Sequence, residues 1–496
     1  MQFVVAGFLL LASWLLLRRQ AGGGSAWRML PLDLGPIVLG WGLVFSLCGR
    51  PVMAAVAVAA VAAGLAMTDA VKRATLREPL VFADRAELLE VVRHPRLYLP
   101  FAGPVKVVGG AAAAVALVAA LVWLEPARWH PWTLLSLPLT VACLVVPTWA
   151  PVLRPLAGWY RRQGLIGDPA ADMRRMGFLA SLVMQATVAR AERDGRRAVV
   201  AGFAAAGGPL RPVVLLQLES FFDARRLGGS IPAGLLPHWD RLRGEAAQAG
   251  RLLVPCWGAN TVRTEFAALT GIDQEALGLD GFNPYERFAQ ARLPSIAWAM
   301  KAAGYRTICL HPFDKRFYAR SAVMPLLGFD EFRGLEAFEG AERAGPYVSD
   351  GAMGRAIATI VAAEGPGVFV FAMTMGNHGP WDQAAGTHAS LPGWASELDG
   401  LAEAGALRGF LAGLVASDAM LGPLMAAMPP GGMLAAYGDH QPSLPEAFRA
   451  LGLEEDSTDY AVWVRDGAPG MAQDVRAEDL PAAVLRVVGA REQAVT

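Results

Sequence analysis

Long apolar runs occupy the first third of the chain, and shorter apolar runs recur through the rest. The runs in the first third approach the length of about 20 residues that crosses a bilayer as a helix. They lie at 2–17, 31–48, 52–67, 105–124 and 133–152. Several tryptophans lie near the ends of these runs, where aromatic belts sit in membrane proteins. The pattern predicts a transmembrane domain of about five spans over residues 1–155.

A different pattern begins after an arginine-containing helical connector at 156–205. Short continuous apolar runs, such as "RPVVLLQLES", "VFVFAMTM" and "GGMLAAYGDH", alternate there with stretches of helical periodicity. Runs that are apolar at every position are typical of strands buried on both faces of a mostly parallel sheet. Helices between such strands cover both faces of the sheet. Residues 206–490 are therefore predicted to form a three-layer α/β domain.

Composition narrows the classes of protein that fit this pattern. The net charge is zero over 496 residues, and no arginine stripe or RNA-binding motif is present, which argues against a nucleic-acid partner. The four cysteines show no CxxC and no zinc spacing; a Cys256–Cys309 disulfide is compatible with the sequence but not required. The first apolar run precedes Arg18 and Arg19. A secretory signal has its charges first, so we expect an uncleaved first span.

Polar side chains follow most of the predicted strands of the α/β domain. Open α/β sheets bind ligands at the carboxyl ends of their strands, so these side chains are expected to meet at one edge of the sheet. They are Glu219, Thr261 and Thr264, His311, Asn377 and His378, and Asp439 and His440.

Glu219, Asp439 and His440 have the chemistry of a metal site. Two carboxylates and an imidazole suit a divalent cation such as Mn²⁺ or Zn²⁺. A hydroxyl bound to such a cation becomes a nucleophile at neutral pH. Thr261 is the candidate, because it precedes "TEFAALTG", a predicted helix start that favours an anion. A threonine, a metal and a helix N-terminus together indicate phosphoryl or sulfuryl transfer.

Each of these residues also has an ordinary structural interpretation. Glu219 alone fits a solvated strand end or a helix-cap partner. Thr261 alone fits an N-cap, with Glu265 in "TVRTE" as a box-like partner. His378 before "GPW" fits a turn. "GDH" after a buried strand is more specific, because it places two ligand types on adjacent residues. The order and placement of all these residues together favour a single site.

Five motifs occur in an order that resembles a known family. They are "LLQLESF", "GANTVRTEFAALTG", "FYARSAVMPLLGFDEF", "MTMGNHGPW" and "YGDHQP". Their order is similar to that of the lipoteichoic acid synthase and phosphoglycerol transferase family, within the sulfatase/alkaline phosphatase superfamily. The resemblance covers about 212–465 and extends to the five-span N-terminal half. It implies a five-helix transmembrane domain followed by an alkaline-phosphatase-like α/β/α domain of sulfatase type.

The resemblance implies roles for individual residues. Glu219, Thr261, Asp439 and His440 would bind one divalent metal ion, Mn²⁺ first, with Mg²⁺ or Zn²⁺ as alternatives, and Thr261 would be the nucleophile. The phosphoglycerol group would be held by Arg320, His378, Tyr318 and His311. Polymerising members commonly have Trp where this chain has Tyr318, which leaves the acceptor open. The formylglycine motif of true sulfatases is absent.

The resemblance also implies a reaction and a location. Phosphoglycerol would move from phosphatidylglycerol, through a covalent threonine intermediate, to a hydroxyl of a glycan or a glycerolphosphate polymer. A phosphoethanolamine transferase, or another metal-dependent phosphodiester hydrolase or sulfatase-like enzyme, is the alternative. The catalytic domain would be periplasmic, on a multi-pass protein of the inner membrane. The arginine-rich loop at 69–104 and the connector point instead to the cytoplasm by the positive-inside rule.

Overall fold

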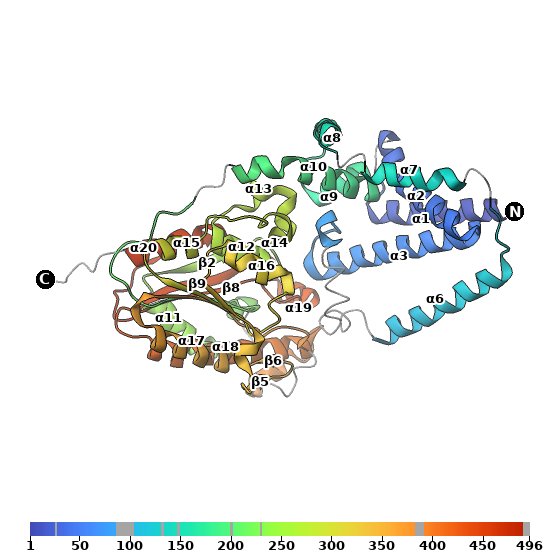
Figure 1. The fold of residues 1–496 in the computed structure, drawn as a ribbon. Coiled ribbons are helices and arrows are strands. Elements are labelled where there is room, and N and C mark those ends of the chain that lie inside the picture. Colours follow the sequence, from blue (N-terminus) through green and yellow to red (C-terminus); the bar gives the residue numbers. More distant parts are fainter. Residues whose placement is uncertain are drawn as a thin grey trace. The chain divides into compact units, whose positions relative to one another are not determined.

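The computed structural model describes residues 1–24, 27–85, 104–129, 133–145, 149–198, 202–228, 231–381 and 391–489. The chain folds into two compact units. The helical unit is Met1–Arg197 together with Gly278–Phe282, and the catalytic unit is Ala198–Leu277 together with Asn283–Thr496. Figure 1 shows helices throughout the first unit and a central sheet in the second.

The helical unit is built from apolar helices followed by amphipathic ones. They are α1 (Gln2–Gln20), α2 (Leu30–Cys48), α3 (Pro51–Leu76), α6 (Pro104–Leu124), α7 (Thr133–Val145), α8 (Ala150–Arg162), α9 (Pro169–Met176) and α10 (Phe178–Ala198). Among the described residues of this unit, α1, α2 and α3 are long and apolar enough to cross a membrane. The first four predicted runs each fall within one helix. The fifth, 133–152, is divided between α7 and α8, and 146–148 lie outside the described residues.

Buried carboxylates hold the ends of these helices. Asp33 of α2 is 1% exposed, and its Oδ1 accepts a hydrogen bond from the amide of Leu179 at the start of α10 (2.9 Å). Glu125, after α6, accepts hydrogen bonds from the amides of Val52 and Met53 at the start of α3 (2.7 and 2.8 Å). The first N–H groups of a helix have no partner within the helix. Each carboxylate therefore supplies acceptors for the free N–H groups of a helix start, and the helix dipole in turn favours a negative charge there.

The catalytic unit is organised by a sheet of nine strands, in the order β10-β2-β9-β8-β1-β7-β3-β4 with β11 beside β2. The strands are β1 (Val213–Leu218), β2 (Gln248–Leu253), β3 (Arg306–Leu310), β4 (Glu331–Arg333), β7 (Val368–Met373), β8 (Met433–Gly438), β9 (Ser457–Val464), β10 (Met471–Ala472) and β11 (Val475–Arg476). A separate hairpin joins β5 (Arg343–Ala344) and β6 (Tyr347–Val348). All neighbours run parallel except β9, which is antiparallel to both β2 and β8.

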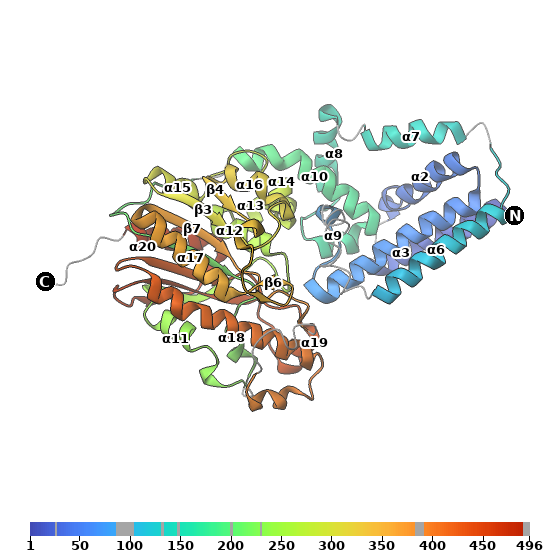
Figure 2. The same ribbon diagram turned by 60° about the horizontal axis from the view of Figure 1, so that its bottom comes forward.

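Helices cover both faces of this sheet, as Figures 1 and 2 show from two directions. They are α11 (Pro237–Gly244), α12 (Thr261–Thr270), α13 (Gln274–Leu277), α14 (Pro284–Arg287), α15 (Ile296–Ala302), α16 (Arg320–Leu326), α17 (Asp350–Glu364), α18 (Ala404–Ala427), α19 (Pro445–Leu451) and α20 (Leu480–Gly489). On β1, Val214 and Leu216 face the core formed with α11, α17 and α18. Val213 and Leu215 face the core formed with α12, α15 and α20. The predicted three-layer α/β/α architecture is confirmed.

Two further features of this unit concern a long apolar helix and the cysteines. Helix α18 has the length and apolar composition of a membrane span, but its residues Leu407, Phe410 and Leu414 are fully buried in the core of the catalytic unit. It therefore packs against the sheet. All four cysteines are free thiols, so Cys256 and Cys309 do not form a disulfide.

Candidate active site

Two neighbouring parallel strands deliver three metal-ligand side chains to one edge of the sheet. Glu219 follows β1, and Asp439 and His440 follow β8; Leu218 and Gly438 are paired at the ends of these strands. Ligand atoms of Glu219, Asp439 and His440 all lie within 4.8 Å of one another, and the three residues are buried. The strand ends therefore meet as the sequence predicts for a ligand site of an open α/β sheet.

Backbone turns hold the two carboxylates in place. Ser220 has φ of 52°, a left-handed conformation that turns the chain directly after Glu219. Its amide donates to Asp439 Oδ1 (2.8 Å), and its hydroxyl donates to Glu219 Oε1 (2.9 Å). The amide of His440 also donates to Asp439 Oδ1 (2.8 Å). The other oxygen, Asp439 Oδ2, is buried and has no hydrogen-bond partner among the described residues.

The imidazole of His440 is oriented by the backbone. Its Nδ1 lies 2.8 Å from the carbonyl oxygen of Gln441, so the proton sits on Nδ1 and donates to that oxygen. The lone pair of Nε2 then faces the carboxylates, at 3.7 Å from Glu219 Oε1 and 3.4 Å from Asp439 Oδ2. A carbonyl that holds the second ring nitrogen is the usual support of a metal-ligating histidine.

The electrostatics of this cluster suit a bound divalent cation. Burial and the Asp439 carboxylate raise the pKa of Glu219 to about 8, because two close buried carboxylates disfavour a second negative charge. Two carboxylates and an imidazole nitrogen fit a divalent cation, and one of the carboxylates has an oxygen without a hydrogen-bond partner among the described residues. Glu219, Asp439 and His440 are the residues that would hold the cation.

Thr261 lies beside this cluster at the first position of α12. Its Oγ1 is 3.3 Å from His440 Nε2. The N-cap is Asn260, with φ of 68° and no side-chain capping bond. The alternative of Thr261 as an N-cap boxed by Glu265 is therefore wrong, because the left-handed turn at Asn260 moves Thr261 into the helix. Thr264 is engaged elsewhere, since its hydroxyl donates to the carbonyl oxygen of Asp439 (2.7 Å).

A buried ion pair extends the site along the same helix. Arg320, 2% exposed, donates from Nε and Nη2 to the carboxylate of Glu265 (2.6–3.2 Å). The Tyr285 hydroxyl donates to the same carboxylate (2.7 Å). Arg320 Nη1 lies 3.5 Å from His311 Nε2, and His311 Nδ1 lies 3.4 Å from the carbonyl oxygen of Met373. Burial and Arg320 lower the pKa of His311, so it is a neutral acceptor here.

Tyr318 lies beside Arg320 of this pair, and His378 lies on the loop after β7. The ring centroid of Tyr318 lies 5.2 Å from Arg320 Cζ, and Tyr318 has φ of 55°. The Nδ1 of His378 lies 2.7 Å from the carbonyl oxygen of Gly379 and 3.2 Å from the Tyr347 hydroxyl. Burial lowers the pKa of His378. Its Nδ1 proton therefore donates to Gly379, and its Nε2 can accept a hydrogen bond.

The strand-end pattern did not single out two supporting residues. Gln441 directly follows the Asp-His pair; its Oε1 accepts from Trp257 Nε1 (3.0 Å), and its Nε2 donates to the carbonyl oxygens of Glu455 and Ser457 (2.9 and 2.8 Å). Its place in "GDHQP" was the only feature of the sequence that could have indicated this supporting role. Asp350, at the start of α17, had no such feature.

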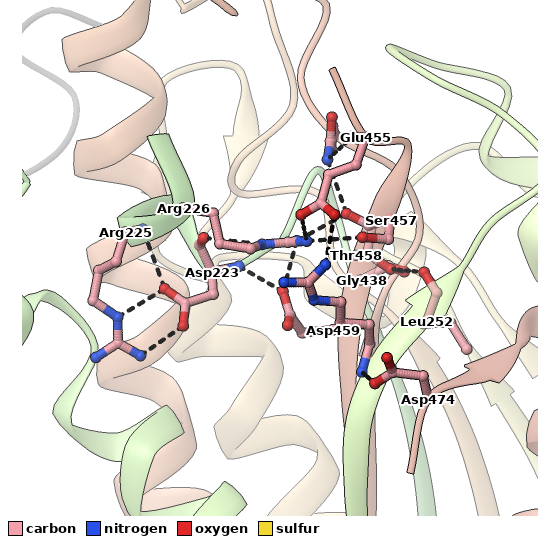
Figure 3. Close-up of polar contacts among 12 residues, drawn as sticks. Asp223, Arg225, Arg226, Leu252, Gly438, Glu455, Ser457, Thr458, Asp459 and Asp474 are labelled. Carbon is pink, nitrogen blue, oxygen red and sulfur yellow. Dashed lines mark hydrogen bonds and ion pairs between the residues drawn. The ribbon is translucent and has the colours of Figure 1, made fainter. Parts of the chain in front are cut away.

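A polar network surrounds the start of β9, as Figure 3 shows. Asp459 Oδ2 accepts from the amide of Asp223 (2.7 Å) and from Arg226 Nη2 (3.0 Å), so it holds the segment that follows Glu219. The Thr458 hydroxyl donates to the carbonyl oxygen of Gly438 (2.7 Å), directly before Asp439. The start of β9 thus ties together the segments that follow β1 and β8, which carry Glu219 and Asp439.

Asp350 supports the loop that carries His378. Its carboxylate accepts hydrogen bonds from the amide of Gly376 (3.0 Å) and the hydroxyl of Ser417 (2.5 Å). Burial raises the pKa of Asp350 to about 6. In the same loop, the Thr374 hydroxyl accepts from the amide of Glu219 (2.9 Å). This loop therefore couples β1 to β7 at the site.

Comparison with known proteins follows the same division of the chain. A sulfatase family model matches residues 211–490. The capsular polysaccharide biosynthesis protein RkpI of Rhizobium meliloti (strain 1021) is 33% identical over 330 residues, which are 62% of this chain and 60% of RkpI. A putative cyclic beta-1,2-glucan modification protein of the same organism is 32% identical over 171 residues, 34% of this chain and 26% of that protein. The chain thus spans less than two thirds of each relative.

A solved membrane protein has a similar fold over nearly the whole chain. It is the integral membrane lipooligosaccharide phosphoethanolamine transferase A of Neisseria meningitidis, with a TM-score of 0.55, 12% identity, and coverage of 98% of this chain and 95% of that one. At this identity the likeness shows the fold alone. Since the family match spans the α/β domain and more than half of the chain, this protein belongs to the sulfatase family.

Proposed function

We propose that the protein is a membrane-anchored, metal-dependent phosphoglycerol transferase. It would move phosphoglycerol from phosphatidylglycerol to a hydroxyl of a glycan or of a glycerolphosphate polymer. The observation that carries the proposal is the buried Glu219–Asp439–His440 cluster with the hydroxyl of Thr261 3.3 Å from His440 Nε2. A nucleophile beside a divalent-cation site at a helix start suits attack on a phosphodiester.

The residues divide the work between metal binding and nucleophilic attack. Glu219, Asp439 and His440 would hold one divalent cation, with Mn²⁺ as our first candidate and Mg²⁺ or Zn²⁺ as alternatives. When bound, such a cation lowers the pKa of a coordinated hydroxyl and offsets charge that develops on phosphoryl oxygens. The turn at Asn260 presents the Thr261 hydroxyl on the cluster's side of α12.

The transfer would take place in two displacements at phosphorus. In the first, the Thr261 hydroxyl loses its proton to solvent and its oxygen bonds to phosphorus. The bond from phosphorus to the diacylglycerol oxygen breaks, and that oxygen takes a proton from solvent. In the second, an acceptor hydroxyl oxygen bonds to phosphorus and loses its proton. The bond from phosphorus to Thr261 breaks, and Thr261 regains a proton.

The flanking polar groups favour a glycerol headgroup. Glu265 occupies Nε and Nη2 of Arg320. One N–H of Nη1 faces His311 Nε2 at 3.5 Å, and its second N–H would serve a phosphoryl oxygen. The neutral His378 offers Nε2 as an acceptor for a glycerol hydroxyl. The Glu265 carboxylate is already paired with Arg320, so it is not a free counterion for the ammonium of ethanolamine. Tyr318 and His311 complete the proposed headgroup pocket.

The acceptor and the location belong to the same proposal. The names of the two relatives, in capsular polysaccharide biosynthesis and cyclic beta-1,2-glucan modification, support a glycan as acceptor. We place the catalytic unit in the periplasm, on a multi-pass protein of the inner membrane with about five spans. A periplasm-specific reporter fused at the C-terminus should be active, and activity of a cytoplasm-specific reporter instead would contradict this orientation.

The test uses membranes that contain the full-length protein and lipid labelled in its headgroup. Label from phosphatidylglycerol should appear on Thr261 and then on an added glycan, and Thr261→Ala should lose both products. Thr270→Ala is the matched control, because Thr270 lies at the other end of α12 and its hydroxyl bonds to the carbonyl oxygen of Phe266 and the amide of Ile272. Transfer by Thr261→Ala at the wild-type rate would refute the nucleophile. Transfer from phosphatidylethanolamine alone would establish the alternative donor.

A further inference from the structure

Besides α10, which has Arg196 and Arg197 in its last turn, three helices of the helical unit carry a pair of arginines there. They are α1 with Arg18 and Arg19, α8 with Arg161 and Arg162, and α9 with Arg174 and Arg175. Cations in the last turn of a helix interact favourably with its dipole. That effect accounts for a basic residue at each end, but it does not bring the three ends together.

Helix α9 lies against the ends of the other two helices. A Cβ at Gly22, just after α1, would lie 3.2 Å from Arg174 Cγ. A Cβ at Gly164, just after α8, would lie 2.7 Å from Arg175 Nη2. The two arginines of α9 therefore cover the turns that follow α1 and α8, and the three pairs converge on one end of the helical unit.

Within the first two pairs, one arginine has a partner and the next is exposed. Arg18 lies 5.0 Å over the ring of Trp14. Arg161 donates twice to the carboxylate of Glu192 (3.0 and 2.8 Å). The remaining four arginines are exposed and have no acidic partner within the described part of the chain. We name this set the arginine collar: Arg19, Arg162, Arg174 and Arg175.

The acids near the collar do not neutralise it. Asp172 is buried and accepts from the amides of Ile166 and Gly167 (2.8 and 3.0 Å). Asp33 caps α10, and Asp69 accepts from Arg73 and from the amide of Leu80 (both 2.6 Å). These carboxylates accept hydrogen bonds from backbone amides or, for Asp69, also from Arg73. They do not pair with the collar, so its positive charge remains exposed to solvent.

We infer that the arginine collar binds the phosphate groups of anionic phospholipids at the membrane surface. The collar begins where α1, an apolar helix long enough to cross a membrane, ends, and this places Arg19 at headgroup depth. Trp159 and Ile166 are exposed beside Arg162 and suit the interfacial layer. A guanidinium matches phosphate with paired hydrogen bonds, and basic clusters next to membrane spans attract anionic lipids.

This inference stands apart from the proposed chemistry. It uses residues of the helical unit only, and it holds for either orientation, because anionic lipid is required only in the leaflet that meets the collar. By the positive-inside rule, the arginines of the connector point to the cytoplasm. Lipid binding would give these arginines a role other than setting the topology.

The experiment measures which lipids stay with the full-length protein. Protein is purified in mild detergent from vesicles of phosphatidylcholine and phosphatidylglycerol, and mass spectrometry compares retained lipids with the bulk mixture. Wild type should be enriched in phosphatidylglycerol, by about five-fold for each arginine that contacts a phosphate, and the enrichment should fall at high salt. A retained mixture equal to the bulk would overturn the inference without any variant.

Variants locate the effect. The double variants Arg174→Gln/Arg175→Gln and Arg19→Gln/Arg162→Gln should each lower the enrichment, and the matching Arg→Lys variants should keep most of it. Arg355→Gln/Arg449→Gln is the charge-matched control, because both arginines are exposed in the catalytic unit and each pairs with a glutamate. Equal enrichment in the Gln variants would overturn the collar. Thr261→Ala should keep the enrichment while losing transfer, so the two proposals can fail separately.

Discussion

Buried carboxylates occur in both units of this protein, but their surroundings differ. In the helical unit, the two oxygens of Asp33 accept hydrogen bonds from Trp14 and Leu179, and both oxygens of Glu125 accept from backbone amides. In the catalytic unit, Asp439 is buried next to a second carboxylate and leaves Oδ2 without a partner among the described residues.

The comparison separates carboxylates that stabilise the fold from those that wait for a ligand. Burying a charge is costly unless it is paired and hydrogen-bonded. The amides at the helix starts donate hydrogen bonds to Asp33 and Glu125, so these buried carboxylates have their partners within the chain. Asp439 and Glu219 instead repel each other when both are ionised, which raises the free-energy cost of burying them. A buried, crowded and unsatisfied carboxylate is thus a better sign of a metal site than burial or charge alone.

Replacing Asp439 by Asn should have the largest effect. Asp439→Asn removes a metal-binding oxygen, so bound metal should be lost and transfer should fall by about 10³-fold or more. Melting of the metal-free protein should not fall, because repulsion with Glu219 is removed. Elemental analysis and a thermal melt measure both quantities.

Asp33→Asn is the contrasting variant for this experiment. It removes hydrogen bonds to a charged acceptor and should cost about 1.5–3 kcal/mol, while the metal content stays at the wild-type level. If Asp439→Asn destabilised the metal-free protein and kept its metal, the distinction between the two kinds of carboxylate would fail.

Asp350 lies between these two kinds, because it is hydrogen-bonded but still has a pKa raised to about 6. The unfolded chain ionises Asp350 near pH 4, whereas the folded chain keeps it protonated up to about pH 6. Stability should therefore fall as pH rises between these values, by up to about 3 kcal/mol. Asp350→Asn removes this loss, so the variant should melt higher than wild type at pH 8. The two proteins should converge below pH 4, and a constant difference at all pH values would refute the assignment.

The smallest of these effects is expected at Gln441, which touches no substrate. Gln441→Leu removes the links to Trp257 and to the start of β9 that position His440. Loss of an outer support of this kind lowers metal affinity by roughly 10-fold to 100-fold. Calorimetric titration with Mn²⁺ measures it, with Gln290→Leu as control because Gln290 is exposed and its side chain donates to the carbonyl oxygen of Glu286 in the preceding helix α14. Unchanged affinity in Gln441→Leu would show that the backbone alone orients His440.

Much of the fold follows from apolar patterning. The main predicted strands appear where continuous apolar runs were found, including β1, β7 and β8. The antiparallel direction of β9 did not follow, because a strand buried on both faces has the same pattern in either direction. Helix α18 shows a related limit, since its composition fits a membrane span as well as a buried helix. Only its packing on the sheet decides between them.

The candidate site was predictable to the extent that it follows strand ends. Glu219, Asp439 and His440 each come directly after a buried strand, and parallel strands end at the same edge. The partners of Glu265 were not predictable. Its position after Thr261 suggested a box-like helix cap, but its carboxylate pairs with Arg320, 55 residues away. Sequence spacing cannot report a contact between two helices that are brought together only by the sheet.

The sequence by itself determined the two-part organisation, the layered α/β class and the set of ligand-type residues, because periodicity and strand-end position are local properties. Only the tertiary structure decided that Asn260 turns Thr261 toward His440, that Asp439 keeps one oxygen without a partner, and that Arg19, Arg162, Arg174 and Arg175 converge. These features depend on distances between segments far apart in the chain. In a different arrangement, the same carboxylates and arginines could act only as helix caps.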